Sequence, residues 1–213
     1  MSANPSDFSQ VGGVILAAGA SSRMGQPKGA LPLSAGGETI VQRVVRVLAA
    51  AGLPRIVVVT GAHPSVADTL AADDSRVTVV HHAGWAAGQL SSLQCGLRWL
   101  QETGPLEAAV VTLVDVPFVQ ADTVVRVLEA WQDSRAPIVR PAHEDRHGHP
   151  VVFDASVFDA LLAADPEQGA KPVVRAHGGR ILNVPVEDEG AFLDVDTPEE
   201  FAQALQRMGP AGR

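Results

Sequence analysis

Short apolar runs alternate with helical stretches along this chain, and that alternation limits the folds that the chain can adopt. Arg55–Thr60 and Ala108–Val114 are almost entirely apolar, which is typical of strands buried on both faces of a parallel sheet. Between them, Leu90–Glu102 carries leucines at helical spacing along one side. Strand, helix and strand repeated in this order imply right-handed crossover connections. We therefore predict an α/β fold with three layers (α/β/α), in which helices cover both faces of a mostly parallel sheet.

The rest of the chain continues this rhythm. The expected strands are Gly13–Ala17, Arg55–Thr60, Val77–His81, Ala108–Val114, Pro137–Arg140, Val151–Phe153 and Arg180–Val184. The expected helices are Thr39–Ala51, Ser65–Ala72, Leu90–Glu102, Ala121–Gln132, Ala155–Ala164, Gly169–His177 and Thr197–Met208. Pro141–Pro150 is polar and rich in histidine, so we expect a mobile loop there. Because no linker interrupts the pattern, we expect a single domain over residues 11–208, with a disordered lead-in at residues 1–10 and a short tail at residues 209–213.

The composition excludes several classes of protein. The 213 residues are 46% hydrophobic and carry a formal net charge of −8, which argues for a packed core and against an extended nucleic-acid or anionic-membrane surface. Cys95 is the only cysteine, so a disulfide framework and a multi-cysteine zinc site are excluded. Val11–Ala20 looks like a signal-peptide core, but no basic residue precedes Arg23 and the run is too short to span a bilayer. We expect a cytoplasmic protein without membrane contact.

A glycine-rich turn follows the first expected strand, with the sequence LAAGASSRMGQPK over residues 16–28. Ligands of open α/β sheets bind outside the carboxyl ends of the strands, which is where this turn falls. Its small residues let backbone N–H groups approach a ligand, and Arg23 and Lys28 add cationic donors for phosphate oxygens. The spacing of Gly19, Gly25 and Lys28 fits neither a Walker A loop nor a dinucleotide fingerprint. The alternative is a flexible surface turn with two cations.

Two aspartates are candidate metal ligands. Asp115 directly follows an apolar strand, so its carboxylate is expected at the same sheet edge as the glycine-rich turn. Asp196 follows the last expected strand region and is the second candidate. Mg²⁺ prefers one or two carboxylates together with phosphate oxygens and water. The alternatives are a strand-end turn for Asp115 and a helix N-cap for Asp196, because Thr197-Pro198-Glu199 is a good helix opening.

The glycine-rich turn also resembles a known signature. LAAGASSRMGQPK is similar to the LAAGxSxRMGxxK motif of nucleotidyltransferases that share a Rossmann-like (glycosyltransferase-A-like) fold. Further segments resemble one branch of that superfamily, the molybdenum cofactor cytidylyltransferases and molybdopterin guanylyltransferases. In family order, these segments are Gly84–Leu93, Val114–Pro117, His147–Pro150, Gln168–Lys171 and Asp194–Glu200. The likeness covers residues 12–207, nearly the whole chain.

This resemblance implies a nucleotide site with a bound metal. The nucleotide-binding residues that it implies are Leu16, Ala17, Ala18, Gly19, Arg23, Lys28, Gly88 and Ser92. Arg23, Lys28 and Asp115 are implied to be catalytic, because they would bind the phosphates or the metal. Mg²⁺ is implied to be held by Asp115 and Asp196.

The acceptor side of the resemblance involves the histidine-rich segment. His149 and Lys171 are implied to contact the acceptor, a small phosphorylated molecule of which molybdopterin is the leading example. Gln168 stands where the family segment has an aspartate, so the acceptor side departs from the pattern. His143 and His147 raise structural zinc as an alternative, but the spacing of the three histidines supplies no fourth ligand.

The implied activity is Mg²⁺-dependent transfer of a nucleotidyl group from an NTP to the phosphate of molybdopterin, with release of pyrophosphate. Ala18 stands where guanylyltransferase relatives tend to carry a second glycine, which favours CTP as the nucleotide. Guanylyl transfer to the same or another small phosphate acceptor is the nearest alternative. A molybdenum-cofactor-loading partner of a molybdenum hydroxylase, with little catalysis of its own, is an alternative of another class. A third alternative is an oxidoreductase, but the chain contains no redox cofactor motif that would support it.

Overall fold

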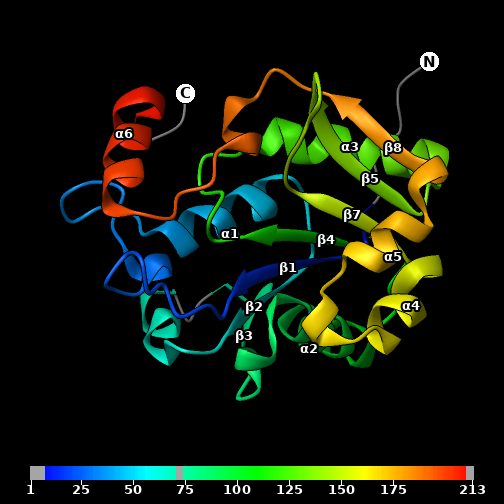
Figure 1. The fold of residues 1–213 in the computed structure, drawn as a ribbon, viewed down its shortest axis with the longest axis horizontal. Coiled ribbons are helices and arrows are strands. Elements are labelled where there is room, and N and C mark those ends of the chain that lie inside the picture. The colour runs from blue at the N-terminus through cyan, green and yellow to red at the C-terminus, as the bar shows by residue number, and fades with distance from the viewer. Residues whose placement is uncertain (1–7, 71–73, 210–213) are drawn as a thin grey trace.

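The chain folds around a mixed sheet, shown in Figure 1 in a computed structural model that describes residues 8–70 and 74–209. In these residues the strands are β1 (Val11–Ala17), β2 (Arg55–Thr60), β3 (Val77–His81), β4 (Ala108–Leu113), β5 (Ile138–His143), β6 (Arg146–His147), β7 (Val151–Asp154) and β8 (Ile181–Pro185). The α-helices are α1 (Ile40–Ala50), α2 (Gln89–Glu102), α3 (Ala121–Ser134), α4 (Phe158–Ala163), α5 (Lys171–Ala176) and α6 (Pro198–Met208). None of the helices in this part of the chain is long and apolar enough to cross a membrane.

Four neighbouring strands on one side of the sheet are parallel. They lie in the order β3-β2-β1-β4, and each adjacent pair runs in the same direction. β7 lies next to β4 and is antiparallel both to β4 and to β5. β8 pairs parallel with β5, whereas β6 forms a short antiparallel hairpin with β5. The prediction of a mostly parallel sheet is confirmed, and its antiparallel pairs all involve the strands β5, β6 and β7.

Helices cover both faces of the sheet because successive residues of a strand point to opposite sides. On β1, Val14 packs in an apolar cluster with residues of α2, α4 and α5, whereas Ile15 packs in a cluster with residues of α1 and α3. Both side chains are fully buried. Figure 1 shows the sheet between these two sets of helices. The expected three-layer α/β/α arrangement is therefore confirmed.

One expected helix, Ser65–Ala72, is instead a short 3₁₀-helix over Pro64–Thr69. The Thr69 hydroxyl donates to the carbonyl oxygen of Val66 at 2.8 Å, which is the acceptor that an α-helix would give to the N–H of Leu70. The Leu70 N–H donates to Ala67 instead, three residues back. Residues 71 and 72 lie outside the described residues. The other expected elements are present near their expected bounds.

The segment expected to be a mobile loop, Pro141–Pro150, is largely built into the sheet. β5 continues to His143, turns through Glu144 with a φ of +52°, and returns as β6. Pairing with β8 continues along β5 through this region, so its backbone groups have partners. Further along, the His149 N–H donates to the carbonyl oxygen of Ala191 at 2.9 Å. The expectation of a mobile loop is wrong because strand pairing, and not side-chain polarity, decides the backbone structure here.

The ends of the chain were expected to be unstructured. Residues 1–7 of the expected lead-in and residues 210–213 of the expected tail lie outside the described residues. Phe8 is 6% exposed and packs in the apolar core, and its carbonyl oxygen accepts a hydrogen bond from the Val11 N–H. The expectation of disorder is wrong for Phe8, because its ring has an apolar surface to cover.

Two loops meet beyond the carboxyl end of β4, and this meeting places the candidate site. The Val195 N–H donates to the carbonyl oxygen of Asp115 at 2.8 Å. Nearby, the Asp188 carboxylate accepts hydrogen bonds from the Gln120 N–H at 2.8 Å and from the Thr123 hydroxyl at 2.7 Å. Residues far apart in the sequence are thereby fixed against each other at the edge of the sheet.

A methyl group at Gly190 is expected to force these two loops apart. A Cβ atom there would lie 2.2 Å from the carbonyl oxygen of Phe118, well inside contact distance. We expect Gly190→Ala to lower the free energy of unfolding by about 1–3 kcal/mol, the usual cost of overpacking. Urea unfolding measures this change, with Gly178→Ala as the control because a Cβ there meets nothing within 4 Å. Equal stability of the two variants would contradict the close contact between the loops.

Candidate active site

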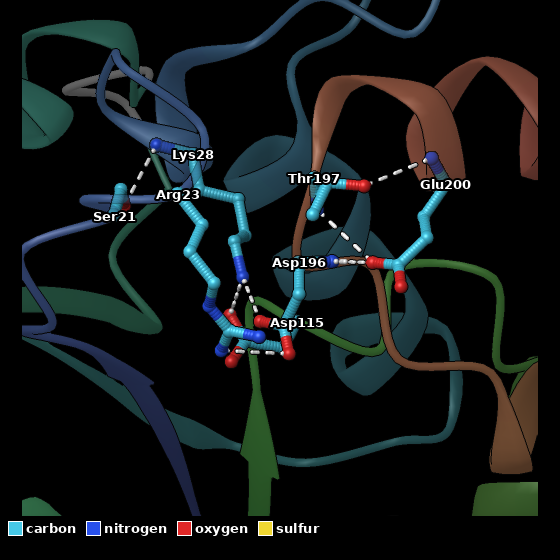
Figure 2. Close-up of polar contacts among 7 residues, drawn as sticks. All are labelled: Ser21, Arg23, Lys28, Asp115, Asp196, Thr197 and Glu200. Atoms are coloured by element: carbon cyan, nitrogen blue, oxygen red, sulfur yellow. Dashed lines mark hydrogen bonds and ion pairs between the residues drawn. The ribbon is translucent and has the colours of Figure 1, made fainter.

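Three charged side chains from distant parts of the sequence meet at the carboxyl edge of the sheet (Figure 2). The ammonium nitrogen of Lys28, Nζ, lies 2.8 Å from Asp115 Oδ1 and 2.9 Å from Asp196 Oδ1. Arg23 adds a further ion pair, with its Nη2 2.9 Å from Asp196 Oδ2. The structure therefore brings together the three residues expected to be catalytic and the two expected to hold a metal.

The charges of this cluster depend on one another. The Lys28 side chain is 6% exposed, and a buried ammonium group needs partners of opposite charge. Asp115 and Asp196 supply them while remaining 35% and 29% exposed. The hydrogen bond from Lys28 lowers the pKa of the Asp196 carboxyl, with Arg23 acting in the same direction. Asp196 is therefore ionised near neutral pH, and the cluster presents two carboxylates to any cation that replaces Lys28.

The glycine-rich turn has a specific conformation that directs Lys28. Ser21 has a φ of +50°, and its carbonyl oxygen accepts hydrogen bonds from the N–H groups of Met24 and Gly25. The Ser21 hydroxyl also accepts a hydrogen bond from the Lys28 N–H at 3.2 Å. These bonds close the turn and lead the Lys28 side chain inward. The alternative of a flexible turn with two surface cations is wrong for Lys28.

Asp196 is available to the site because its neighbour caps the following helix. Thr197 is the N-cap of α6, and its hydroxyl accepts a hydrogen bond from the Glu200 N–H at 3.2 Å. The Glu200 carboxylate accepts in return from the N–H groups of Thr197 and Asp196, as Figure 2 shows. The alternative that made Asp196 the N-cap is therefore wrong, and its carboxylate turns to Lys28 and Arg23.

A cavity of about 360 Å³ opens beside these charges. Its walls contain every residue expected to bind the nucleotide, namely Leu16, Ala17, Ala18, Gly19, Arg23, Lys28, Gly88 and Ser92. Asp115 and Asp196 line the same cavity. The lining of the cavity thus combines small residues, two cations and two carboxylates, which are groups that suit a triphosphate with a metal.

A second cavity, of about 570 Å³, adjoins the first and contains the two residues expected to bind the acceptor, His149 and Lys171. Both cavities are lined by Leu16, Gly88, Gln89 and Leu113. Burial lowers the pKa of the His149 ring, whose Nδ1 lies 3.5 Å from the carbonyl oxygen of Val111. The His149 ring is therefore neutral near pH 7, whereas Lys171 is an exposed residue of the same cavity lining.

Two residues that sequence reasoning assigned no role lie at the site. His63 lines the first cavity, and its Nε2 lies 2.8 Å from the carbonyl oxygen of Ala20 in the glycine-rich turn. It follows the carboxyl end of β2, so the rule that singled out Asp115 could have found it.

Partial burial raises the pKa of the Asp194 carboxyl, and the nearby Asp115 adds to this effect. Only its place in the DVDTPEE segment pointed to Asp194.

The donor set fits Mg²⁺ in the presence of a bound phosphate. Asp115 and Asp196 are hard oxygen ligands, and a single cation, the Lys28 ammonium, already contacts both. Within residues 8–70 and 74–209, no three His, Cys, Asp or Glu side chains are grouped so that they could hold a metal by themselves. The structural zinc alternative at the three histidines therefore lacks its ligand set in these residues.

The family of the chain follows from comparison with known proteins. The model of one protein family, the MobA-like NTP transferase domain, matches residues 13–181. The chain belongs to this family. It is therefore a nucleotidyltransferase relative with a Rossmann-like fold, and the resemblance noted in its sequence is confirmed.

Individual relatives of this chain carry different names. Nicotine blue oxidoreductase of Paenarthrobacter nicotinovorans is 30% identical over 206 residues, covering 93% of this chain and 98% of that protein. Molybdenum cofactor cytidylyltransferase of Escherichia coli strain K12 is 27% identical over 194 residues, with coverages of 91% and 95%. Molybdenum cofactor guanylyltransferase of Rhodobacter capsulatus is 30% identical over 213 residues, with coverages of 93% and 97%. Identity at this level supports the class of reaction and leaves the nucleotide base open.

One solved structure has the same fold as this chain. Rv0371c of Mycobacterium tuberculosis H37Rv, in complex with manganese, is 28% identical and has a TM-score of 0.71, over 93% of this chain and 99% of that chain. The match therefore covers most of both chains.

Removal of the Lys28 ammonium is expected to strengthen binding of a divalent cation in the absence of nucleotide. Asp115 and Asp196 share this ammonium, so a metal ion must compete with it for the same oxygens. We expect Lys28→Met to bind Mn²⁺ about fivefold more tightly than the parent, the effect of an ion pair of roughly 1 kcal/mol. Isothermal titration calorimetry measures the affinity. Arg46→Met is the control, because Arg46 pairs with Glu38 and lines neither cavity of the site. Unchanged or weaker Mn²⁺ binding by a folded Lys28→Met protein would contradict this competition.

Proposed function

We propose that this protein transfers a CMP group from CTP to the phosphate of molybdopterin and releases pyrophosphate. The observation that carries the proposal is the cluster of Lys28, Asp115 and Asp196 at the wall of one cavity, which adjoins a second cavity. In the proposed reaction, a phosphate of the acceptor attacks a phosphate of the nucleotide, so both substrates must bind side by side. Two connected cavities, with positive charge and two carboxylates at one of them, suit such a pair of substrates. Family membership supports nucleotidyl transfer as the class of reaction. The choice of CTP as the nucleotide and of molybdopterin as the acceptor is our proposal.

The reaction requires little covalent chemistry from the protein. The phosphate of the acceptor is ionised near neutral pH, so its attack needs no general base. One of its oxygens forms a bond to the α-phosphorus of the nucleotide, and the bond from that phosphorus to the oxygen bridging to the β-phosphate breaks. Pyrophosphate leaves with the electron pair of the broken bond. The protein contributes by holding the two phosphates in line and by neutralising their charges.

The charged residues divide these tasks. Lys28 and Arg23 line the first cavity and are placed to bind phosphate oxygens of the nucleotide. Asp115 and Asp196 would hold Mg²⁺, which when bound supplies further neutralisation of the phosphate charge. The Lys28 ammonium contacts both carboxylates in this structure, and it would be free to bind phosphate oxygens if a metal ion held those carboxylates.

The first cavity supports CTP as the nucleotide. Ala18 lines this cavity, is 5% exposed, and has its carbonyl oxygen fixed by a hydrogen bond from the Ala62 N–H at 3.0 Å. The methyl group of Ala18 therefore has a set position and takes space that a glycine would leave open. Cytosine has one ring and guanine has two, so a smaller space favours CTP. Trp85, which lines the same cavity, offers an aromatic surface.

The second cavity supports a planar, anionic acceptor. Its walls are mostly apolar and include Val111, Ile138 and Phe153, which suit the face of a flat heterocycle. The neutral ring of His149 and the ammonium of Lys171 add polar contacts. Molybdopterin has both a flat ring system and a phosphate, and two of the relatives are named for the molybdenum cofactor.

Pyrophosphate release tests the proposed reaction directly. Purified protein is incubated with Mg²⁺, molybdopterin and CTP, GTP, ATP or UTP in turn, and we expect the fastest release with CTP. Asp115→Asn is expected to slow release by about 100-fold or more, the usual effect of removing one charged group from such a site. Glu199→Gln is the matched control, because Glu199 is an exposed acid three residues from Asp196 that lines neither cavity.

Two outcomes would overturn parts of the proposal. Turnover with GTP and none with CTP would overturn the assignment of CTP as the nucleotide and would leave the assignment of molybdopterin as the acceptor unchanged. No release with any nucleotide above the Asp115→Asn level would overturn nucleotidyl transfer to molybdopterin. Tight binding of molybdopterin without release would then favour the alternative of a cofactor-loading partner.

A further inference from the structure

The second cavity contains cations that have no carboxylate partner. Arg140, Lys171 and Arg175 line it, and none of them forms an ion pair within the described part of the chain. Glu167 lines the cavity too but makes no ion pair with them. The chain has 24 acidic and 16 basic residues besides its histidines, so carboxylates outnumber these cations overall. Three unpaired cations around one cavity are what an anionic ligand requires.

Arg140 is the least expected of the three, because it lies on a strand face that is otherwise apolar. Ile138 and Arg140 share one face of β5, and Ile138 is fully buried in the cluster formed with α2 and α4. Burial lowers the pKa of the Arg140 guanidinium. The charge itself adds nothing to apolar packing, and a bound anion would offset the cost of burying it.

Asn183 holds the guanidinium of Arg140 in a defined direction. The two residues are register partners on the parallel strands β5 and β8. Asn183 Oδ1 accepts a hydrogen bond from Arg140 Nε at 2.9 Å. The two terminal amino groups of Arg140 make no hydrogen bond to the rest of the described chain. A guanidinium fixed through Nε presents those two groups as a planar fork for an oxygen or sulfur anion.

The helix α5 adds two charges to the same cavity. Lys171 and Arg175 are four residues apart on α5, so they lie on one face of the helix. Like charges at this spacing destabilise a helix slightly, and a bound anion would reverse that effect. Both side chains are exposed, so they can approach a ligand without leaving a buried position.

Arg140 lies away from the phosphate-transfer centre. β5 is two strands from β4 in the sheet order, which is about 10 Å at normal strand spacing. The register of β5, β7 and β4 places Arg140 near the level of Val111, four residues or roughly 13 Å before Asp115. One phosphate cannot contact both Arg140 and the metal site at Asp115. Any anion at Arg140 is therefore a second anionic group.

We propose that Arg140, positioned by Asn183 and assisted by Lys171 and Arg175, binds a second anionic group of the acceptor. This inference rests on the proposed function, because it concerns the acceptor of the same reaction. It defines the acceptor as a planar apolar body with two separate anionic groups, one phosphate that attacks and one group that the fork holds. In molybdopterin, the dithiolate is such a group. Phosphorylated acceptors without a second anion would bind less well.

Steady-state kinetics with CTP and molybdopterin test the role of Arg140. Arg140→Met is expected to raise the KM for molybdopterin about tenfold or more, the effect of losing a charge-assisted hydrogen bond. The KM for CTP is expected to stay the same, because Arg140 does not line the first cavity. Arg180→Met is the control, since Arg180 is exposed and lines neither cavity. An unchanged KM for molybdopterin in Arg140→Met would overturn the proposal.

A double-mutant cycle tests the positioning role of Asn183. Asn183→Ala is expected to raise the KM for molybdopterin several-fold in the parent protein and to have no further effect in Arg140→Met. Additive effects of the two substitutions would show that Asn183 acts independently of Arg140 and would overturn this part. Arg140→Lys is expected to recover only part of the loss, because lysine keeps the charge but lacks the fork.

Sulfate binding separates this inference from the proposed function. Sodium sulfate, compared with sodium chloride at equal ionic strength, is expected to raise the Tm of the parent protein more than that of Arg140→Met. This measurement needs no turnover. If the parent releases no pyrophosphate, the proposed function fails, and the sulfate comparison still decides whether Arg140 binds anions. Equal Tm shifts for the parent and Arg140→Met would overturn the anion site.

Discussion

The ammonium group of Lys28 lies between the carboxylates of Asp115 and Asp196, and the geometry of the whole site depends on this contact. A lysine side chain that is 6% exposed is stable only with anions beside it, so the glycine-rich turn and the two aspartate loops must come together. The hydrogen bond from the Val195 N–H to the carbonyl oxygen of Asp115 fixes the two loops at the backbone. Together these contacts place one basic and two acidic groups at the carboxyl ends of the parallel strands.

This local balance of charge explains how a chain with a net charge of −8 can act on polyanions. Arg23 and Lys28 lie at the first cavity, where they form ion pairs with the carboxylates of Asp196 and Asp115. Arg140 and Lys171 lie at the second cavity and have no carboxylate partner in the described chain. Net charge is therefore no guide to a cavity, where a few residues set the local potential. Both substrates of the proposed reaction are small anions that meet such local cations.

Local rules predicted the fold and much of the site. Lys28 and Asp115 both follow apolar strands, and the carboxyl ends of parallel strands share one edge, so their meeting could be expected. The contact of Lys28 with both aspartates could not, because Asp196 reaches the site through a loop whose path depends on tertiary packing. The expectation of a mobile loop over Pro141–Pro150 is wrong because the partners of β5 in β8 lie about forty residues further along the chain. Contacts at such separation leave no local pattern in the sequence.

A crystal structure of the protein with CTP and Mn²⁺ would test the central role of the Lys28 position most directly. Anomalous scattering locates the manganese independently of the protein atoms. We expect a single manganese peak within coordination distance of both Asp115 and Asp196, with Lys28 Nζ turned from these carboxylates to a phosphate oxygen of the nucleotide. A manganese ion bound elsewhere, with Lys28 still between the two carboxylates, would contradict this assignment of the site.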